Sequence, residues 1–218
     1  MVTSRKGFQS AVLDENRLSR TSGSARAKLY KELKGRYLLD DEVPLFSAFL
    51  AEWRSIHSES ERSLLTYVLW ALNDRTVVVT SCDWLYPHLR RASSELRVGD
   101  LEAFLRSKGK HGHPEVAEWT AETLKRVAQH YLASVRDFGL ATGGAKKIAV
   151  RPSLQPAPVR LLLRALQLAD VAAIQIIRHE IFKILGIAPG EVVDALAELN
   201  RIGAIRFRMQ ADVIELSL

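Results

Sequence analysis

The stretch SVRDFGLATGGAKKIAVRP, residues 134–152, decides how this chain is expected to fold. Apolar residues stand four positions and one position before Gly139, and a short apolar segment with paired lysines follows it. The stretch ELNRIGAIRFRMQADVIEL, residues 198–216, repeats this spacing around Gly203 and carries paired arginines. Because glycine adopts positive φ without strain, each glycine is expected to end a helix that is followed by a short hairpin.

The segment before Gly139 has the clearest helical pattern of the sequence. Residues 119–139 read WTAETLKRVAQHYLASVRDFG, with apolar side chains at steps of three and four along one face. Thr120 is the expected N-cap, because its hydroxyl can accept a hydrogen bond from the backbone of the first turn. The remaining face carries Lys125, Arg126, Gln129, His130 and Arg136. This pattern predicts a helix with one buried side and one basic side.

Residues 60–75, SERSLLTYVLWALNDR, also have the apolar period of a helix. The β-branched segment TVVVTS, residues 76–81, follows directly and fits a short strand. A run of this length does not distinguish a strand from the entry of a helix, so both alternatives stay open.

Residues 159–187, VRLLLRALQLADVAAIQIIRHEIFKILGI, form the most apolar region. Charged residues interrupt it at short intervals, whereas a membrane span needs about 20 mostly uncharged residues. The region therefore predicts two buried helices. The N-terminal residues lack the apolar core of a signal peptide, and the single cysteine, Cys82, fits a reducing compartment. A cytoplasmic protein without membrane contact is expected.

Prolines divide the chain into three parts. The stretch RPSLQPAPV begins at Arg151, and residues 151–158 are the expected linker. Residues 1–150 then form an N-terminal helical region that ends in a helix-turn-helix unit. Residues 159–218 form a C-terminal winged-helix-like unit whose alternating tail, AIRFRMQADVIELSL, predicts a β-hairpin. The expected fold class is mainly α, with two helix-turn-helix units of winged-helix type and a short C-terminal hairpin.

The two units differ in charge. The helix before Gly203 exposes Glu191, Asp194 and Glu198, which would repel a phosphate backbone, whereas the helix before Gly139 is basic. No acidic residue occurs between Asp137 and Asp170, although the chain contains 25 aspartates and glutamates. The net charge of +6 also suits a polyanion. The residues expected to contact double-stranded DNA are Lys125, Arg126, Gln129, Lys146, Lys147, Arg151, Arg206, Arg208, Arg26 and Lys28.

Motifs for catalysis or cofactor binding are weak. The segment GLATGGAKK lacks the spacing of a phosphate-binding loop, and the lysine pair is followed by Ile148 in place of a hydroxyl residue. His111 and His113 have no cysteine or second ligand pair at a spacing typical of zinc sites. We therefore expect a protein that is not an enzyme and that needs no cofactor or metal.

Two other functional classes remain open. A helix-turn-helix transcription regulator would form a symmetric dimer that pairs two half-sites. No heptad pattern or separate dimerisation segment is visible, so a monomer is expected. A helical scaffold that binds RNA or protein is the other alternative; RNA readers display stacking aromatic side chains, whereas the aromatic residues here fall mostly on apolar stripes.

In its layout the chain resembles the BrxA family of the BREX phage-defence systems. The resemblance rests on the segments RLSRTSGSARAKLYKELKGR, LLTYVLWALNDRTVVVTSCDWLYPHLRR and WTAETLKRVAQHYLASVRDFGL and on the basic stretch after them. It implies an almost entirely helical fold with helix-turn-helix motifs beside positive surface. It also implies a non-enzymatic, double-stranded DNA-binding accessory protein that works beside a DNA methyltransferase and other components of the defence apparatus.

Overall fold

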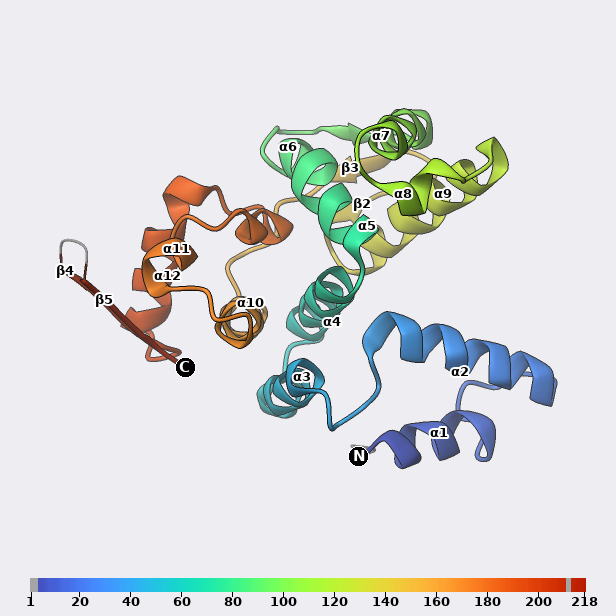
Figure 1. The fold of residues 1–218 in the computed structure, drawn as a ribbon, viewed down its shortest axis with the longest axis horizontal. Coiled ribbons are helices and arrows are strands. Elements are labelled where there is room, and N and C mark those ends of the chain that lie inside the picture. Colours follow the sequence, from blue (N-terminus) through green and yellow to red (C-terminus); the bar gives the residue numbers. More distant parts are fainter. Residues whose placement is uncertain (1–3, 211–212) are drawn as a thin grey trace.

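The computed structural model describes residues 4–210 and 213–218, and these residues are mainly α-helical (Figure 1). The N-terminal half contains α1 (Arg5–Leu13), α2 (Gly23–Tyr37), α3 (Pro44–Ser55), α4 (Glu59–Asn73), α5 (Arg75–Val79), the π-helix η1 (Thr80–Leu85) and α6 (Tyr86–Leu89). The middle contains β1 (Glu95–Leu96), α7 (Val98–Lys110), α8 (Pro114–Ala117), α9 (Ala121–Asp137), β2 (Ala141–Thr142) and β3 (Lys147–Ala149). The C-terminal part contains α10 (Pro156–Leu168), α11 (Ala173–Ile176), the 3-10 helices η2 (Glu180–Leu185) and η3 (Pro189–Glu191), α12 (Val192–Arg201), β4 (Arg206–Gln210) and β5 (Val213–Ser217). The prediction of a mainly α protein with a C-terminal hairpin is confirmed.

Helices α1 and α2 form an arm that stands away from the other helices (Figure 1). No residue of α2 is buried, so this helix contributes little to the core. Aromatic contacts attach the arm to α3 and α4, and the Asn73 amide of α4 donates to Arg36 O at 3.2 Å. Phe8 packs edge-on against Phe46 of α3 at 5.6 Å, and the Arg36 guanidinium lies 5.0 Å from the ring centre of Trp70 on α4.

The main core is shared by α3, α4 and α10, which pack against one another. Leu161, Leu162 and Leu163 on α10 are fully buried, although α10 follows the proline-rich stretch. Residues 151–155 belong to no helix or strand, and α10 begins at Pro156, where proline is tolerated because a first-turn N–H has no partner within the helix. The helix thus starts inside the expected linker.

The β-branched segment 76–81 is helical. Asp74 ends α4 and caps α5, because its Oδ1 accepts hydrogen bonds from the Thr76 and Val77 N–H groups at 2.9 and 3.2 Å. This cap makes the segment begin a helix. Of the two alternatives, the helix entry is therefore correct and the strand is wrong. The chain then continues through η1 into α6.

The middle of the chain combines helices with a three-stranded antiparallel sheet in the order β1-β3-β2. Glu95 of β1 pairs with Ile148 of β3, and Ala141 of β2 pairs with Ala149. Helices α7 and α9 pack on each other, and α9 packs against β2. The sheet therefore connects the segment before α7 to the hairpin after α9.

The C-terminal part contains shorter helices than the sequence pattern predicts. Helix α10 ends at Leu168, and Asp170 has a positive φ of 53° that turns the chain. The following apolar residues form α11 and η2 in place of one long second helix. Strands β4 and β5 form the expected hairpin, in which Arg208 pairs with Glu215. The expected turn residues 211–212 lie outside the described residues.

Both glycines of the repeated pattern end a helix in the same way. Gly139 has φ of 83° and Gly203 has φ of 73°. At the first, the Gly139 N–H donates to Arg136 O at 3.0 Å and the next N–H donates to Val135 O at 2.8 Å. At the second, the equivalent bonds run to Asn200 O and Leu199 O at 3.0 and 2.9 Å. This is the hydrogen-bond pair of the Schellman cap, so the predicted caps are confirmed.

Within the residues that the structure describes, no helix combines the length and the apolar character that crossing a bilayer requires.

Candidate nucleic-acid interface

Helix α9 presents a basic face outward because its apolar stripe is fully used by the core. Thr120 caps the helix as predicted, since its Oγ1 accepts from the Thr123 N–H at 3.2 Å. The buried side comprises Leu124, Ala128, Tyr131, Leu132 and Val135. Lys125, Arg126 and Gln129 are exposed on the other side. Arg126 lies 3.7 Å from Glu122 one turn earlier; with the two side chains 67% and 72% exposed, this weak pair leaves its guanidinium accessible.

A buried cluster of hydroxyl groups fixes how α9 is rotated against the core. The Ser81 hydroxyl of η1 donates to Val77 O at 2.6 Å, so it accepts from Tyr67 of α4 at 2.6 Å and from Tyr131 of α9 at 3.1 Å. Burial raises the pKa of Tyr67 to about 12 and raises the pKa of Tyr131 well above its usual value. Both phenols therefore stay neutral and hydrogen-bonded, and α9 is held at one orientation.

The β2–β3 hairpin carries the two predicted lysines. Gly143 begins its turn with φ of 90°, a conformation that L-residues rarely adopt. The Lys147 Nζ donates to Gly144 O at 2.9 Å, which closes the turn from outside. The Lys146 Nζ lies 3.6 Å from a Glu95 carboxylate oxygen, and this lysine is 69% exposed. The structure thus places Lys146 in the turn and Lys147 at the start of β3.

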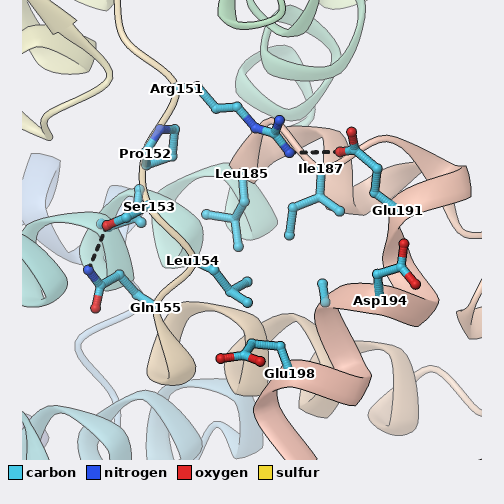
Figure 2. A pocket seen from close by; sticks show the side chains of 12 residues that line it. Arg151, Pro152, Ser153, Leu154, Gln155, Leu185, Ile187, Glu191, Asp194 and Glu198 are labelled. Carbon is cyan, nitrogen blue, oxygen red and sulfur yellow. Dashed lines mark hydrogen bonds and ion pairs between the residues drawn. The ribbon is translucent and has the colours of Figure 1, made fainter.

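Arg151 differs from the other predicted contacts because it takes part in an internal ion-pair cluster. Its Nη2 lies 2.7 Å from Glu191 Oε2 (Figure 2). Arg90 binds both oxygens of the same carboxylate at 2.7 and 2.8 Å. The Ala188 N–H also donates to it at 3.1 Å. Hydrogen bonds from Arg90 and from Ala188 hold the pKa of Glu191 below its usual value. This cluster joins the residue that follows α6, the 151–155 segment and the end of η3, where α12 begins.

Arg206 and Arg208 are exposed on β4, in the hairpin at the end of the molecule opposite α2 (Figure 1). They lie on one face of the hairpin, where Arg208 stands opposite Glu215. The α12 carboxylates are partly neutralised within the chain, since Glu198 binds Arg201 through two hydrogen bonds of 2.6 and 2.8 Å. Arg201 is thus engaged with Glu198 and is not a free cation of the second unit.

Lys28 is exposed and Arg26 half-buried on α2, which is separate from α9. A cavity of about 600 Å³ lies between the two helices. Its lining includes Arg36 of α2, Trp70 of α4, Trp119, and His130 of α9. The predicted residues therefore occupy three places: the α9 face with its hairpin, the α2 arm, and the C-terminal hairpin.

Among the residues that the structure describes, no three histidine, cysteine, aspartate or glutamate side chains gather in a way that would hold a metal ion. His111 is bound through Nδ1 to Ser107 O at 2.6 Å, and His113 through Nδ1 to Glu115 at 3.1 Å. Each of these histidines is engaged within its own loop.

The sequence reasoning missed Arg90, which binds the same carboxylate as Arg151, and Tyr67, which takes part in the hydroxyl cluster that holds α9. Arg90 is 101 residues away from Glu191, so no local pattern indicates their pairing. Tyr67 falls on an ordinary apolar stripe, and only its hydroxyl contact with Ser81 distinguishes it from a core residue.

These features define a class: a basic, mainly helical protein that presents a positively charged helix together with a short hairpin. The BrxA family model matches residues 3–165, and the chain belongs to the BrxA family. The chain is therefore a component of a BREX phage-defence system. The match includes α9 and the β2–β3 hairpin and ends within α10. No curated protein and no solved structure matched the chain.

Proposed function

We propose that this chain is a non-enzymatic, double-stranded DNA-binding component of the defence system, which acts as a cytoplasmic monomer. The observation that carries the proposal is the α9 face with exposed Lys125, Arg126 and Gln129, followed directly by a hairpin with Lys146 and Lys147. A helix held rigidly by its opposite side and flanked by a basic hairpin suits the groove and the adjacent phosphates of a duplex.

The arrangement of elements supports the same reading. A helix precedes β1, the helices α7, α8 and α9 follow it, and two further strands give the sheet order β1-β3-β2. We interpret this unit as a winged helix in which α9 is the recognition helix and β2–β3 is the wing. The wing lysines are then placed to contact the phosphate backbone.

Low sequence preference follows from the side chains that α9 offers. Lys125 and Arg126 suit phosphates or guanine edges, whereas Gln129 is the exposed amide able to form a bidentate pair with adenine. Phosphate contacts position a protein and carry no base information. We expect most of the binding free energy to come from phosphate contacts.

The second unit is proposed as a lesser contact. Its α12 carries Asp194 on the outer face, where this carboxylate would repel phosphate, while Glu198 is bound by Arg201. Arg206 and Arg208 on the hairpin remain available to a duplex that reaches that end of the molecule. The α2 residues Arg26 and Lys28 would add contacts only where the duplex extends along the arm.

Duplex binding measured by fluorescence anisotropy at several salt concentrations tests the proposal. If roughly four to six phosphates are neutralised, log K falls with log salt at a slope of about −4 to −5. Changing Lys146 and Lys147 together to glutamate is expected to weaken binding at least tenfold, or ~1.4 kcal/mol, and to flatten the slope by about two. The matched control changes Arg206 and Arg208 to glutamate, and it is expected to reduce the affinity for duplex DNA less than the lysine variant does.

Circular dichroism of both variants shows whether either change unfolds the protein. A wild-type chain that does not bind duplex DNA at low salt contradicts the proposed function. A larger loss from the arginine pair, with both variants folded, contradicts the choice of α9 and its hairpin as the main interface. A molar mass of twice the chain mass, measured by light scattering, would contradict the proposed monomer and favour a symmetric transcription regulator.

A further inference from the structure

The cavity between α2 and α9 combines aromatic and charged side chains. Its volume of about 600 Å³ lies within the range of ligand pockets, which is ~300–1,000 Å³. The buried part of its lining is mostly apolar or aromatic and includes Trp70, Val77, Leu101, Leu105 and Tyr131. The exposed or half-buried part includes Glu32, Arg36, Asp74, Trp119 and His130. The cavity thus has an apolar interior and polar groups toward solvent.

The charged groups of this cavity are not neutralised by the residues that the structure describes. None of the ion pairs formed by residues 4–210 and 213–218 includes Glu32, Arg36 or Asp74. The Arg36 guanidinium lies 5.0 Å from the centre of the Trp70 ring, and no described acceptor binds its N–H groups. Asp74 uses Oδ1 to cap α5, whereas no described donor binds Oδ2. Both donors and acceptors are therefore available to a ligand.

Trp119 supplies an aromatic ring on which a ligand can stack. It is half-buried and lines the cavity directly before Thr120, the cap residue of α9. Among the described residues it takes part in no aromatic pair and no cation–π contact. Trp70, by contrast, already lies against Tyr131 and Arg36. Trp119 is therefore the platform that the cavity offers to a flat ring.

Both helices that border the cavity carry predicted DNA contacts one turn away from it. On α9, His130 lines the cavity and follows Arg126 by four residues, so the two side chains are neighbours on the helix surface. On α2, Glu32 stands in the same relation to Lys28. A duplex on the α9 face would therefore lie next to the cavity.

The lining selects a flat, uncharged ring that has both donors and acceptors. Phosphate is disfavoured because the carboxylates of Glu32 and Asp74 outnumber the single guanidinium of Arg36. A purely apolar ring would leave these hydrogen-bonding groups without partners. Guanine meets each requirement, because its ring stacks, its N–H groups suit carboxylates, and its O6 and N7 atoms accept hydrogen bonds from an arginine.

We propose that this cavity binds one unpaired nucleobase, with guanine preferred, from the DNA on the α9 face. The proposal rests on the proposed function, because the bound duplex supplies the base. Trp119 stacks on the ring, while Arg36 and the carboxylates of Glu32 and Asp74 bind its edges. Leaving the helical stack costs least for a base that has no pairing partner, so DNA with an unpaired base is the expected ligand.

Fluorescence anisotropy with three labelled duplexes tests the proposal. The first duplex is fully paired, and the second carries one bulged guanine. The third has an abasic residue at the bulge, which keeps the flexible backbone and removes the base. We expect the guanine bulge to bind roughly tenfold tighter than either of the others, an effect at the lower end of base–aromatic stacking. Equal affinity for the guanine bulge and the abasic bulge overturns the proposal.

Substitution of Trp119 tests whether the cavity is the place of binding. Trp119→Leu is expected to remove the preference for the guanine bulge and to leave the affinity for the paired duplex unchanged, whereas Trp119→Phe should retain part of the preference. The matched control, Trp53→Leu, removes a half-buried tryptophan from α3 and should keep the full preference. Circular dichroism shows whether each variant is folded. A folded Trp119→Leu variant that still prefers the guanine bulge overturns the proposal.

Guanosine alone tests the cavity without DNA, with two-dimensional amide NMR of the full wild-type chain as the readout. We expect saturable shifts for amides of residues 32–37, 70–77 and 119–134, and shifts confined to other surfaces overturn the proposal. A chain that binds no duplex but shows the expected shifts contradicts the proposed function and supports the cavity as a nucleobase site. Duplex binding without any preference for the guanine bulge does the reverse: the proposed function stands, and DNA is overturned as the source of a base in this cavity.

Discussion

Replacing Gly143 by alanine is expected to damage DNA binding without unfolding the protein. Gly143 has φ of 90°, and a Cβ built there would overlap the carbonyl oxygen of Lys146. Left-handed backbone costs an L-residue about 1–2 kcal/mol, so the turn is expected to open rather than accept the overlap. An open turn loses the Lys147 contact with Gly144 O and moves Lys146 away from Glu95.

The magnitude follows from the two lysines that the turn positions. If both lysines lose their contacts with DNA phosphates, the slope of log K against log salt flattens by about two. The affinity for the duplex then falls roughly tenfold, or ~1.4 kcal/mol. The assay is anisotropy of a labelled duplex at several salt concentrations, together with thermal melting. Because the hairpin lies at the surface, the melting temperature should change much less than the affinity.

Gly144→Ala is the matched control, one residue further along the same turn. A Cβ at Gly144 meets nothing within 4 Å, and its φ lies outside the left-handed region. We expect normal DNA binding and stability equal to or slightly above that of the wild type. The reasoning is refuted if Gly143→Ala binds DNA like the wild type, or if both alanine variants lose the same affinity.

Two further predictions concern stability. Ser81→Ala removes the shared acceptor of Tyr67 and Tyr131 in the buried hydroxyl cluster, and urea unfolding should show a loss of about 1–3 kcal/mol; a neutral result would mean that water or rearrangement replaces the serine. Because the pKa of Glu191 is lowered in the folded chain, its contribution to stability is present above the ordinary pKa of 4.5 and is lost as pH falls through the folded value. The melting temperature of Glu191→Gln should therefore fall less than that of the wild type between neutral pH and pH values below 4.5, and an equal fall in both would contradict this linkage.

The parts of the fold that local chemistry determines were predictable from the sequence. The α9 stripe, its Thr120 cap and the cap at Gly139 follow from residues within one or two turns of each other. The C-terminal hairpin follows from strict alternation in a short segment. These features need no information about distant residues, because their hydrogen bonds close within the element or its neighbour.

The remaining features depend on contacts between distant residues. Strand β1 has only two residues and exists because Glu95 and Leu96 pair with β3. The segment 76–81 has the composition of a strand, and the Asp74 cap outweighs that preference. For the candidate site, composition identified the exposed basic residues, whereas the engagement of Arg151 with Glu191 required the packing of α6 and α12 against the 151–155 segment.

The position of α10 has a consequence for how such a chain can be recombined. Its buried leucines pack against α3 and α4. A chimera joined at the prolines would therefore expose apolar surface on both pieces. Grafting is expected to succeed only where few buried contacts cross the junction. The chain turns at Asp170 after Leu168, close to residue 165 where the family match ends, but η2 beyond this turn still packs against η1, α4 and α6. Both α10 and η2 therefore have to remain with the helices against which they pack.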